Sequence, residues 1–292
     1  MKAFAVRTLI LLSAASSFLA TGANAQGIPA DPDPTRLANA PNSGDDWQVQ
    51  IGLGALYSPA FLGSDDYQLQ AGPNIEVRYQ DRFFISMIDG IGFDLIKTDN
   101  FRAGPIVNYG QGRNEDGSSS FRIAGARTDA LLGLGDISGA AEVGGYLAYQ
   151  SGGFSAKVEV RQAIGSHDGL IAQLGARYTT GLTGLTVGDR TPIFSIGPRV
   201  TIVDDNYNQA FFGIDAGQSA RSGLAEYDAG GGLQSYGVGT ALILPVSKNL
   251  SAALLGGYDR LAGDAADSPL VLERGSRNQA TVGLGLTYRF GM

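Results

Sequence analysis

The sequence contains one histidine, and a hydroxyl and a carboxylate stand beside it. In "GSHDG", His167 lies between Ser166 and Asp168. Serine hydrolases activate a serine hydroxyl with a histidine base, because the hydroxyl must lose its proton near neutral pH. Three residues adjacent in sequence rarely place their side chains in such a relay, and small polar residues around a histidine are typical of a turn. We therefore expect a turn at this place, and a protein that is not an enzyme.

Metal and nucleotide sites have little support. With no cysteine and one histidine, the sequence lacks the ligands of a zinc or iron centre. Three acidic segments, residues 63–66, 204–208 and 263–269, offer carboxylates to Ca²⁺, but none has the spacing of a known calcium loop, which favours solvated turns. The Gly-x-Gly pairs at 52/54, 237/239 and 283/285 lack the third glycine of a nucleotide loop. We expect no metal and no cofactor.

A larger set of charged residues shares one property: each falls on the register opposite the apolar residues of an alternating segment. The set consists of Glu76, Arg78, Arg102, Glu142, Lys157, Glu159, Arg161, Arg177, Arg199, Asp259 and Arg289. On one shared face these groups form either the filter of a channel or a ladder of opposite charges that fills an interior. Buried opposite charges must pair in both cases.

The elements that carry this set read as β-strands. Alternation predicts 12 of them, at about residues 47–57, 67–79, 82–97, 101–109, 140–150, 154–164, 170–180, 193–203, 208–215, 234–244, 250–260 and 278–290. Most have the length of about 9 to 11 residues that a tilted strand needs to cross a bilayer. Segment 82–97 contains Asp89-Gly90, a common hairpin dipeptide. Split there, each half is too short to span, so we expect one strand with a kink.

Alternation by itself also fits a soluble sandwich. Strand length, the even strand count, aromatic strand ends, export and the aromatic end of the last strand together favour a membrane barrel. Residues 1–25 carry Lys2 and Arg7, an apolar run and Ala23-Asn24-Ala25, the pattern of a cleaved secretory signal. No later apolar stretch approaches the roughly 18 residues of a spanning helix. We expect three parts: the signal peptide, a flexible extension at 26–46, and a single barrel domain at 47–292.

The predicted fold is an all-β, antiparallel, up-and-down transmembrane barrel in the outer membrane of a Gram-negative cell, with both termini in the periplasm. The aromatic end of the last strand, Tyr288 and Phe290, is the expected signal for the barrel-assembly machinery. The formal net charge of −7 becomes about −9 without the signal peptide. This acidic balance argues against nucleic acid as a partner, because phosphate contacts need clustered Lys and Arg.

With the N-terminus in the periplasm and successive strands antiparallel, the count of 12 strands fixes the direction of each strand. These directions place segment 110–139 and the turn around His167 in the periplasm. Segment 110–139 is too long for a usual periplasmic turn. Its second half carries a small amphipathic patch that we interpret as a docking surface for a periplasmic partner. The patch consists of Arg122, Arg127, Ala130, Leu131, Leu132 and Leu134. A plug inside the barrel and an extracellular loop are the alternatives.

Several blocks of the sequence resemble the MipA/OmpV family of outer-membrane proteins, in the same order from about Trp47 to Phe290. They include "LGALYSPAFLGSDDYQLQAGPNIEVRY", "VRQAIGSHDGL", "SIGPRVTIVDDNYNQAFFGI" and "AGDAADSPLVLERGSRNQATVGLGLTYRF". One departure is Gly291-Met292 after the terminal aromatic. The resemblance implies a structural scaffold that holds a lytic transglycosylase and a murein synthase together, and no catalytic residues travel with it. A narrow porin-like channel for small solutes is the alternative function.

Overall fold

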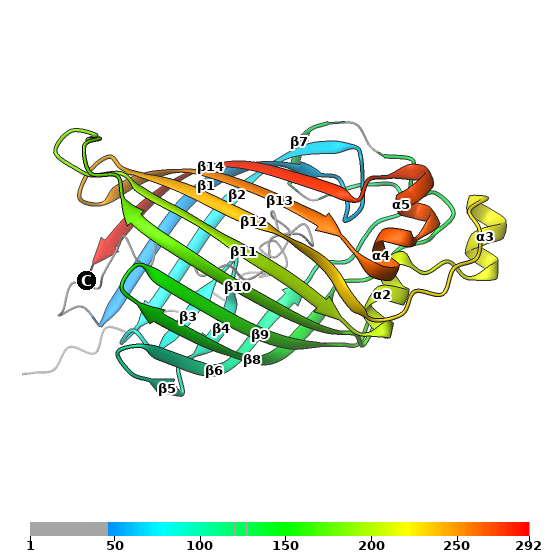
Figure 1. The fold of residues 1–292 in the computed structure, drawn as a ribbon, viewed down its shortest axis with the longest axis horizontal. Helices are drawn as coiled ribbons and strands as arrows, with labels where there is room; N and C mark the ends of the chain where they lie inside the picture. Colours follow the sequence, from blue (N-terminus) through cyan, green and yellow to red (C-terminus); the bar gives the residue numbers. More distant parts are fainter. Residues whose placement is uncertain (1–45, 120, 126–127, 292) are drawn as a thin grey trace, which may run out of the picture.

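The computed structural model describes residues 46–119, 121–125 and 128–291. Within them the long strands form one antiparallel sheet that closes on itself, because β1 (Trp47–Pro59) pairs with both β2 (Tyr67–Tyr79) and β14 (Asn278–Gly291). Figure 1 shows the resulting barrel from the side. The predicted all-β barrel of 12 wall strands is confirmed. The predicted signal peptide and all but the last residue of the predicted extension lie outside the described residues.

The remaining wall strands follow in chain order. They are β3 (Phe83–Ser86), β4 (Gly90–Phe93), β6 (Phe101–Gly110), β8 (Ala140–Ser151), β9 (Phe154–Ile164), β10 (Leu170–Gly181), β11 (Ile193–Val203), β12 (Gly232–Pro245) and β13 (Leu250–Leu261). Two short strands lie beside this path: β5 (Ile96–Lys97) pairs with β6, and β7 (Arg122–Ala124) pairs with β2. All wall strands except β3 and β4 are long enough to cross a bilayer.

The single strand predicted at 82–97 is wrong. The chain turns back after Ser86, and β3 and β4 form a hairpin with Ser86 opposite Gly90. The Ser86 Oγ accepts the backbone N–H groups of Ile88 and Asp89, at 3.2 and 3.1 Å. Gly90 has a φ of +80°, which a glycine adopts without strain. The Asp89-Gly90 dipeptide therefore makes the turn that its type indicates.

The strand predicted at 208–215 is also wrong. These residues fall mostly in α2 (Asp205–Phe212), which begins after Asp204. The Asp204 side chain accepts the N–H of Tyr207, and such an N-cap satisfies a donor that a helix start leaves unpaired. The count of 12 strands is unchanged because the hairpin adds one strand and the helix removes one.

The two ends of the barrel differ. We call the end that holds Trp47 and Gly291 the terminus end, and the opposite end the lid end. Turns at the terminus end, such as 152–153 and 246–249, are mostly short, and residues 182–192 make a longer one. The lid end carries the long segments 111–139, 204–231 and 262–277.

The extra strand reverses the direction of β6 to β11 relative to our expectation. Segment 111–139 and the turn around His167 therefore lie at the lid end, opposite the chain termini of the barrel. The prediction that both share the end of the termini is wrong. The cause is the hairpin that we counted as one strand. The added strand moves every later turn to the other end of the barrel, until the absent strand at 208–215 restores the expected directions.

The faces of the wall follow the alternation. Leu53, Leu284 and Leu286 point outward and are 64, 62 and 54% exposed, whereas the neighbouring inward residues Glu76 and Arg78 are buried. A belt of exposed aliphatic side chains this extensive is unusual for a soluble protein and typical of the lipid-facing surface of a membrane barrel. The interior is correspondingly polar. No helix in the described part of the chain is long and apolar enough to cross a membrane.

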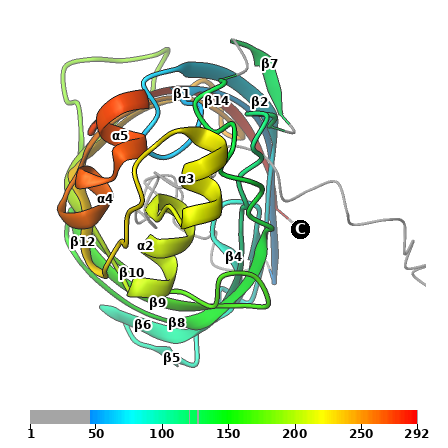
Figure 2. The same cartoon turned by 90° about the vertical axis from the view of Figure 1, so that its right-hand side faces the viewer.

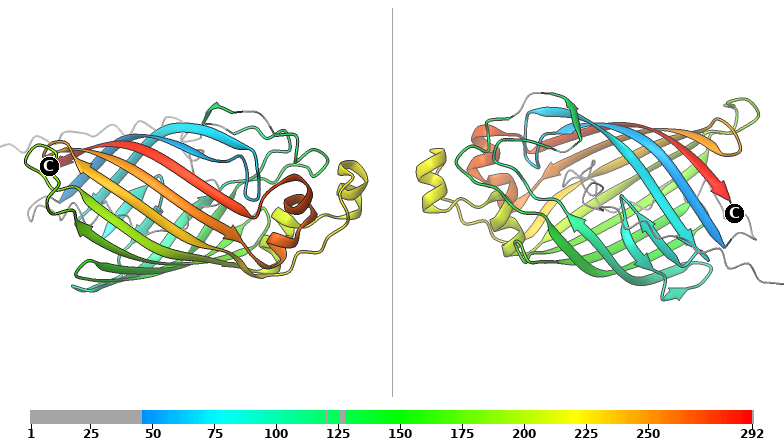
Figure 3. Two further views of the ribbon diagram at one scale, coloured as in Figure 1. Left: turned by 45° about the horizontal axis from the view of Figure 1, so that its top comes forward. Right: turned by 180° about the vertical axis from the view of Figure 1, so that it is seen from behind.

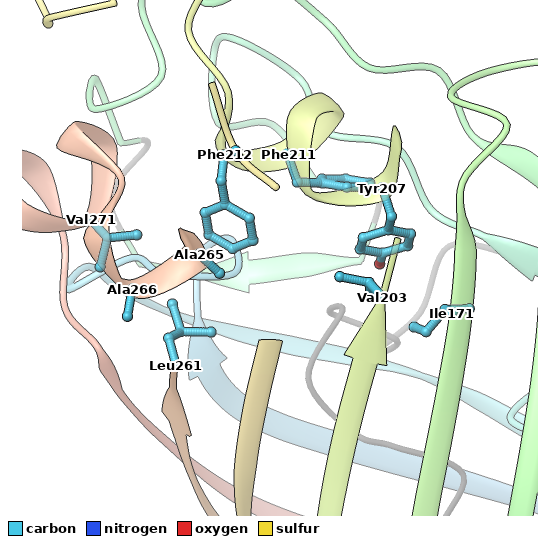
Figure 4. Packing of buried hydrophobic residues seen from close by; sticks show 10 residues of the cluster. Ile171, Val203, Tyr207, Phe211, Phe212, Leu261, Ala265, Ala266 and Val271 are labelled. Atoms are coloured by element: carbon cyan, nitrogen blue, oxygen red, sulfur yellow. The ribbon is translucent and has the colours of Figure 1, made fainter. Parts of the chain in front are cut away.

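The long segments of the lid end fold into a separate apolar core, which we call the lid. It comprises α2, α3 (Ala216–Ser222), α4 (Gly263–Asp267) and α5 (Pro269–Arg274), and Figure 2 shows these helices in front of the barrel mouth. Phe212 is fully buried and points toward Ala265 and Leu261 in Figure 4. Leu131 and Leu270, 1% exposed each, belong to an adjoining cluster. Burial of each such large side chain stabilises the lid by about 1.5 to 3 kcal/mol.

Polar contacts tie the lid segments together. The Ser268 Oγ donates to the Phe212 carbonyl at 2.7 Å. Arg274 donates to the carbonyls of Ala130 and Ser222, and Arg113 donates to the Phe211 carbonyl at 2.6 Å. The lid is therefore one packed unit made from three loops rather than three independent loops.

Candidate functional site

The barrel interior holds the charged residues that the register singled out. Most of them are buried: Glu76, Arg78, Glu142, Lys157, Glu159, Arg161, Arg177, Arg199 and Asp259. Arg102 and Arg289 are half-buried. The inward face of β8 to β11 carries six of the set, and we call this face the charged wall: Glu142, Lys157, Glu159, Arg161, Arg177 and Arg199.

Ion pairs connect most of the charged wall. Lys157 Nζ lies 2.6 Å from a Glu159 carboxylate oxygen, and Arg161 Nε lies 2.7 Å from Glu142. Arg161 also pairs with Glu159, so one carboxylate joins two cations. A third acid, Asp89 at the tip of the β3–β4 hairpin, lies 3.8 Å from Lys157 across the lumen. The ladder of opposite charges thus crosses from the wall to the hairpin.

The two other arginines of the charged wall contact residues of β11 and β13. Arg199 makes a two-point ion pair with Asp259, with Nε to Oδ1 at 2.8 Å, and Arg177 donates to the Ser195 Oγ at 2.7 Å. The Arg199–Asp259 pair depends on small neighbours. A Cβ on Gly257 would lie 2.6 Å from the Arg199 guanidinium, and one on Gly237 would lie 2.2 Å from the Asp259 carboxylate.

A second charge cluster lies near the terminus end and includes acids that the register could not identify. Arg102 contacts Asp81 at 2.7 Å and Asp94 at 2.8 Å, and Lys97 contacts Asp81 at 2.8 Å. Burial by itself would raise the pKa of Asp81, but hydrogen bonds and charges of Arg102 and Lys97 outweigh it and lower that pKa to about 2. Asp81, Asp89 and Asp94 belong to turns or hairpin ends, where alternation gives no face.

The opposite side of the interior is built from small residues. Inward positions of β12, β13, β14 and β1 form what we call the small-residue wall: Gly239, Ala241, Ala253, Gly285 and Gly54. A cavity of about 330 Å³ lies between this wall and the charged wall. Tyr207 and Phe211 of α2 line it on the lid side. This volume is at the lower end of the roughly 300 to 1,000 Å³ usual for small-molecule pockets.

The His167 group does not form a relay. The His167 Nδ1 accepts the Gly169 N–H at 3.1 Å, the Ser166 Oγ donates to the Ser138 carbonyl at 2.6 Å, and Asp168 accepts the Gly165 N–H. Burial lowers the pKa of His167 and outweighs the opposing charges, the largest of them Glu142. Each candidate side chain is thus engaged elsewhere, as turn chemistry requires.

Two of the acidic segments accept backbone N–H groups. Asp204 caps α2, and the Asp264 carboxylate accepts the Gly230 N–H at 2.7 Å. Among the described residues, no group of three or more potential ligands of the His, Cys, Asp or Glu type comes together as a metal site.

The two aromatics of the closing strand share the outer face. The rings of Tyr288 and Phe290 lie 4.7 Å apart between centroids, and both side chains are 43% exposed. Phe290 pairs in register with Val49, and Gly291 continues the ladder opposite Gln48. The residue after the terminal aromatic is therefore part of the strand.

Comparison with known proteins gives one family. The model of the MltA-interacting protein MipA family matches residues 51–290, which is most of the chain. No curated protein matches.

Solved structures give broad likenesses only. The NanC porin aligns with 82% of this chain and 98% of its own, at 7% identity and a TM-score of 0.40. A bacterial polysaccharide outer-membrane secretin aligns with 85% of this chain and all of its own, at 10% identity and 0.41. The toluene transporter TbuX of Ralstonia pickettii aligns with 94% and 97%, at 12% identity and 0.34. TM-scores this low give no ground for transferring a function.

Proposed function

The chain belongs to the MltA-interacting protein MipA family of outer-membrane β-barrels, and from that premise we propose that it is a non-catalytic scaffold for murein-remodelling enzymes. The observation that carries this proposal is the lid. A packed apolar core stands over one mouth of the barrel, and paired charges occupy one side of the lumen. A barrel closed in this way serves as a rigid anchor better than as an open pore.

The lid also supports an orientation. Membrane barrels keep their periplasmic turns short and extend their loops outside the cell. On this rule the lid end is extracellular, and the terminus end, with Trp47 and Gly291, is periplasmic. Segment 111–139 then lies on the outer side and is not the docking surface for a periplasmic enzyme.

The docking surface in this proposal is the terminus end. Its longest turn, 182–192, projects beyond the wall and carries Leu185, which is 60% exposed. Val246 in the neighbouring turn is 50% exposed. Predicted partners are a lytic transglycosylase and a murein synthase, as the family's name and resemblance suggest.

Site-specific photo-crosslinking tests this arrangement. A photoreactive residue replaces Leu185 or Val246 at the terminus end, and Ala220 of α3 serves as the exposed control at the lid end. We expect adducts with a purified lytic transglycosylase from the first two positions and none from Ala220. Adducts from Ala220 alone, or from none of the three, contradict the scaffold.

The cavity favours a second candidate, a narrow channel that conducts when the lid moves. Single-channel recording in planar bilayers distinguishes the two. The scaffold predicts no stable open steps for the intact protein, and regular steps favour the channel.

We also propose that Tyr288 and Phe290 are read during assembly. Phe290→Asp should leave unfolded protein in the periplasm, because it places a charge in the outward apolar face of the last strand. Removal of Gly291 and Met292 should leave the level of heat-modifiable barrel unchanged. Normal amounts of folded Phe290→Asp protein in the outer membrane refute this role.

A further inference from the structure

The barrel wall is incomplete between β2 and β6. The β3–β4 hairpin that stands between them is four residues high on each side, so β3 pairs only with residues 76–79 of β2. On the other side, β4 pairs only with Ile106 and Val107 of β6. Figure 3 shows the short hairpin between its two long neighbours. We call the space between β2 and β6 on the lid side of the hairpin tip the side notch, and we describe positions nearer the lid end as above.

At the centre of the β2 edge of the notch, the backbone has no N–H donor. Above it, the Ala71 N–H donates to the Phe121 carbonyl at 3.0 Å, and below it, the Ile75 carbonyl accepts the Met87 N–H at 3.1 Å. Between these two contacts stands Pro73, which has no N–H to offer a neighbouring strand. Proline is one of the standard means by which a strand edge is kept from pairing.

The β6 edge is satisfied by its own side chain. The Tyr109 N–H donates to the Asn108 Oδ1 at 2.8 Å. A buried or lipid-exposed backbone donor is costly when unpaired, and here a local side chain replaces the missing strand. Both edges are therefore stable without a strand between them.

The hairpin is fixed at its reduced height. At its tip, Asp89 contacts Lys157 of the charged wall at 3.8 Å. Beneath the tip, Phe84 packs with Ile106 and Tyr146, and its ring lies 6.0 Å from that of Tyr146. These contacts hold the lower border of the notch in place.

The notch lies at the level of the apolar belt. Pro73 pairs in register with Leu53, and Leu53 pairs with Leu286, both exposed on the outer face. At the lower border, Ile88 is 52% exposed. The same border residues, Pro73, Ile88, Asn108 and Phe121, also line the interior cavity. The cavity therefore extends to the border of the notch.

We propose that the side notch is a lateral portal and that the cavity binds one single-chain amphiphile taken from the lipid phase. An acyl tail that enters at this level meets Pro73, Ile88 and Phe121 at the border, and contact with these apolar side chains favours its entry. Inside, Ile243, Tyr207 and Phe211 offer apolar contact, and the charged wall offers ion-pairing and hydrogen-bonding groups to a polar head. The small volume limits the guest to one chain.

Thiol labelling from the membrane tests the portal. The sequence has no cysteine, so Ala241→Cys places a single thiol on the small-residue wall of the cavity. N-dodecylmaleimide is dissolved in the lipid of proteoliposomes, and a sulfonated maleimide is added to the water as the reference reagent. We expect the lipid-borne reagent to label Ala241→Cys.

Two second-site variants change the portal in opposite directions. Gly72 faces the inside of the notch, and its Cβ position lies 3.3 Å from the Phe121 ring, so Gly72→Trp should obstruct the opening. It should slow labelling by the lipid-borne reagent about tenfold, which corresponds to about 1.4 kcal/mol of added barrier. Phe121→Ala keeps the backbone contact to Ala71 and widens the opening, so labelling should become faster.

The control is Gly145→Trp, which adds the same bulk to the outward face of β8, where the nearest atom stands 3.4 Å from the Cβ position. It should leave the rate unchanged, and the aqueous reagent should be insensitive to all three variants. Heat-modifiable migration confirms that each variant folds. Equal rates in Gly72→Trp and Gly145→Trp, together with no acceleration in Phe121→Ala, overturn the portal. This outcome is independent of the crosslinking result for the scaffold.

Discussion

The charged wall and the small-residue wall face each other across one lumen, and they solve the same geometric problem differently. Both obey the two-residue alternation of a strand. On the charged wall, long side chains fill the space and constrain one another through ion pairs. On the small-residue wall, glycine and alanine leave space open beside the larger inward side chains of Leu56, Ile243 and Leu255. Alternation thus decides which residues point inward, and their size decides whether the interior is filled or open.

The largest expected effect comes from the most connected acid of the charged wall. Glu159 is 1% exposed and contacts both Lys157 and Arg161, so Glu159→Gln leaves two buried cations short of a partner. We expect a loss of about 3 to 5 kcal/mol in the free energy of unfolding. Urea unfolding in lipid vesicles, with Ala253→Ser on the small-residue wall as the control, measures it. Equal stability of the two variants would show that the wall does not depend on its ion pairs.

The next effect separates the interior from the lipid face. Leu284→Arg puts a charge on the outward belt and should cost about 2 to 4 kcal/mol near the middle of the bilayer. Thr287→Arg, on the inward register three residues later, should cost much less because the small-residue wall has room for it. The same vesicle assay compares them, and equal losses would contradict the assignment of the two faces.

A pair of glycines tests the role of size directly. A Cβ on Gly237 would lie 2.2 Å from both the Tyr258 carbonyl and the Asp259 carboxylate, whereas one on Gly285 would have its nearest neighbours at 3.9 and 4.0 Å. Gly237→Ala should therefore destabilise by about 1 to 3 kcal/mol through overpacking. Gly285→Ala should be near neutral. The urea midpoints of the two variants measure the difference. Equal shifts in both variants would contradict the role of side-chain size in this description.

The smallest effect concerns the cluster at the terminus end. The pKa of Asp81 is about 2, below its ordinary value of 3.8, so its ion pairs add stability at neutral pH that is lost as the pH falls from about 4 through 2. Asp81→Asn should remove about 1 to 2 kcal/mol at pH 7, a figure reduced for partial exposure, and should flatten the stability profile across that acid range. Asp189→Asn in an exposed turn is the control. An unchanged acid profile in Asp81→Asn would assign the acid sensitivity to other groups.

Sequence patterns predicted the wall better than its connections. Register placed Glu76, Lys157 and Glu159 on one face because successive side chains of a strand point to opposite faces. It missed Asp81, Asp89 and Asp94, since side chains in turns do not alternate in this way. The requirement that every strand span the bilayer led to the wrong single strand at 82–97, although Asp89-Gly90 indicated a turn.

The helix at the lid was missed for a related reason. Ala210, Phe212 and Ile214 share one register of the predicted strand, and Phe211 breaks the alternation on the other register. In the structure Phe211 and Phe212 are both buried, and adjacent buried residues fit a helix under a packed lid better than a two-faced strand. The usable signal was Asp204, an acid that caps the third residue after it. The Pro73 edge was equally visible and marked the place where β2 loses its neighbour.

The seam between β1 and β14 sets a condition on biogenesis. Gln48 pairs with Gly291, so the first strand of the domain waits for the last before the cylinder exists. Until then one edge of β1 has unpaired backbone N–H and C=O groups, which can pair with a strand of another chain. Contacts this distant along the chain also form slowly, because a long loop must close first. The newly exported polypeptide therefore needs protection in transit, and its commitment to the closed form comes only with delivery of the final segment.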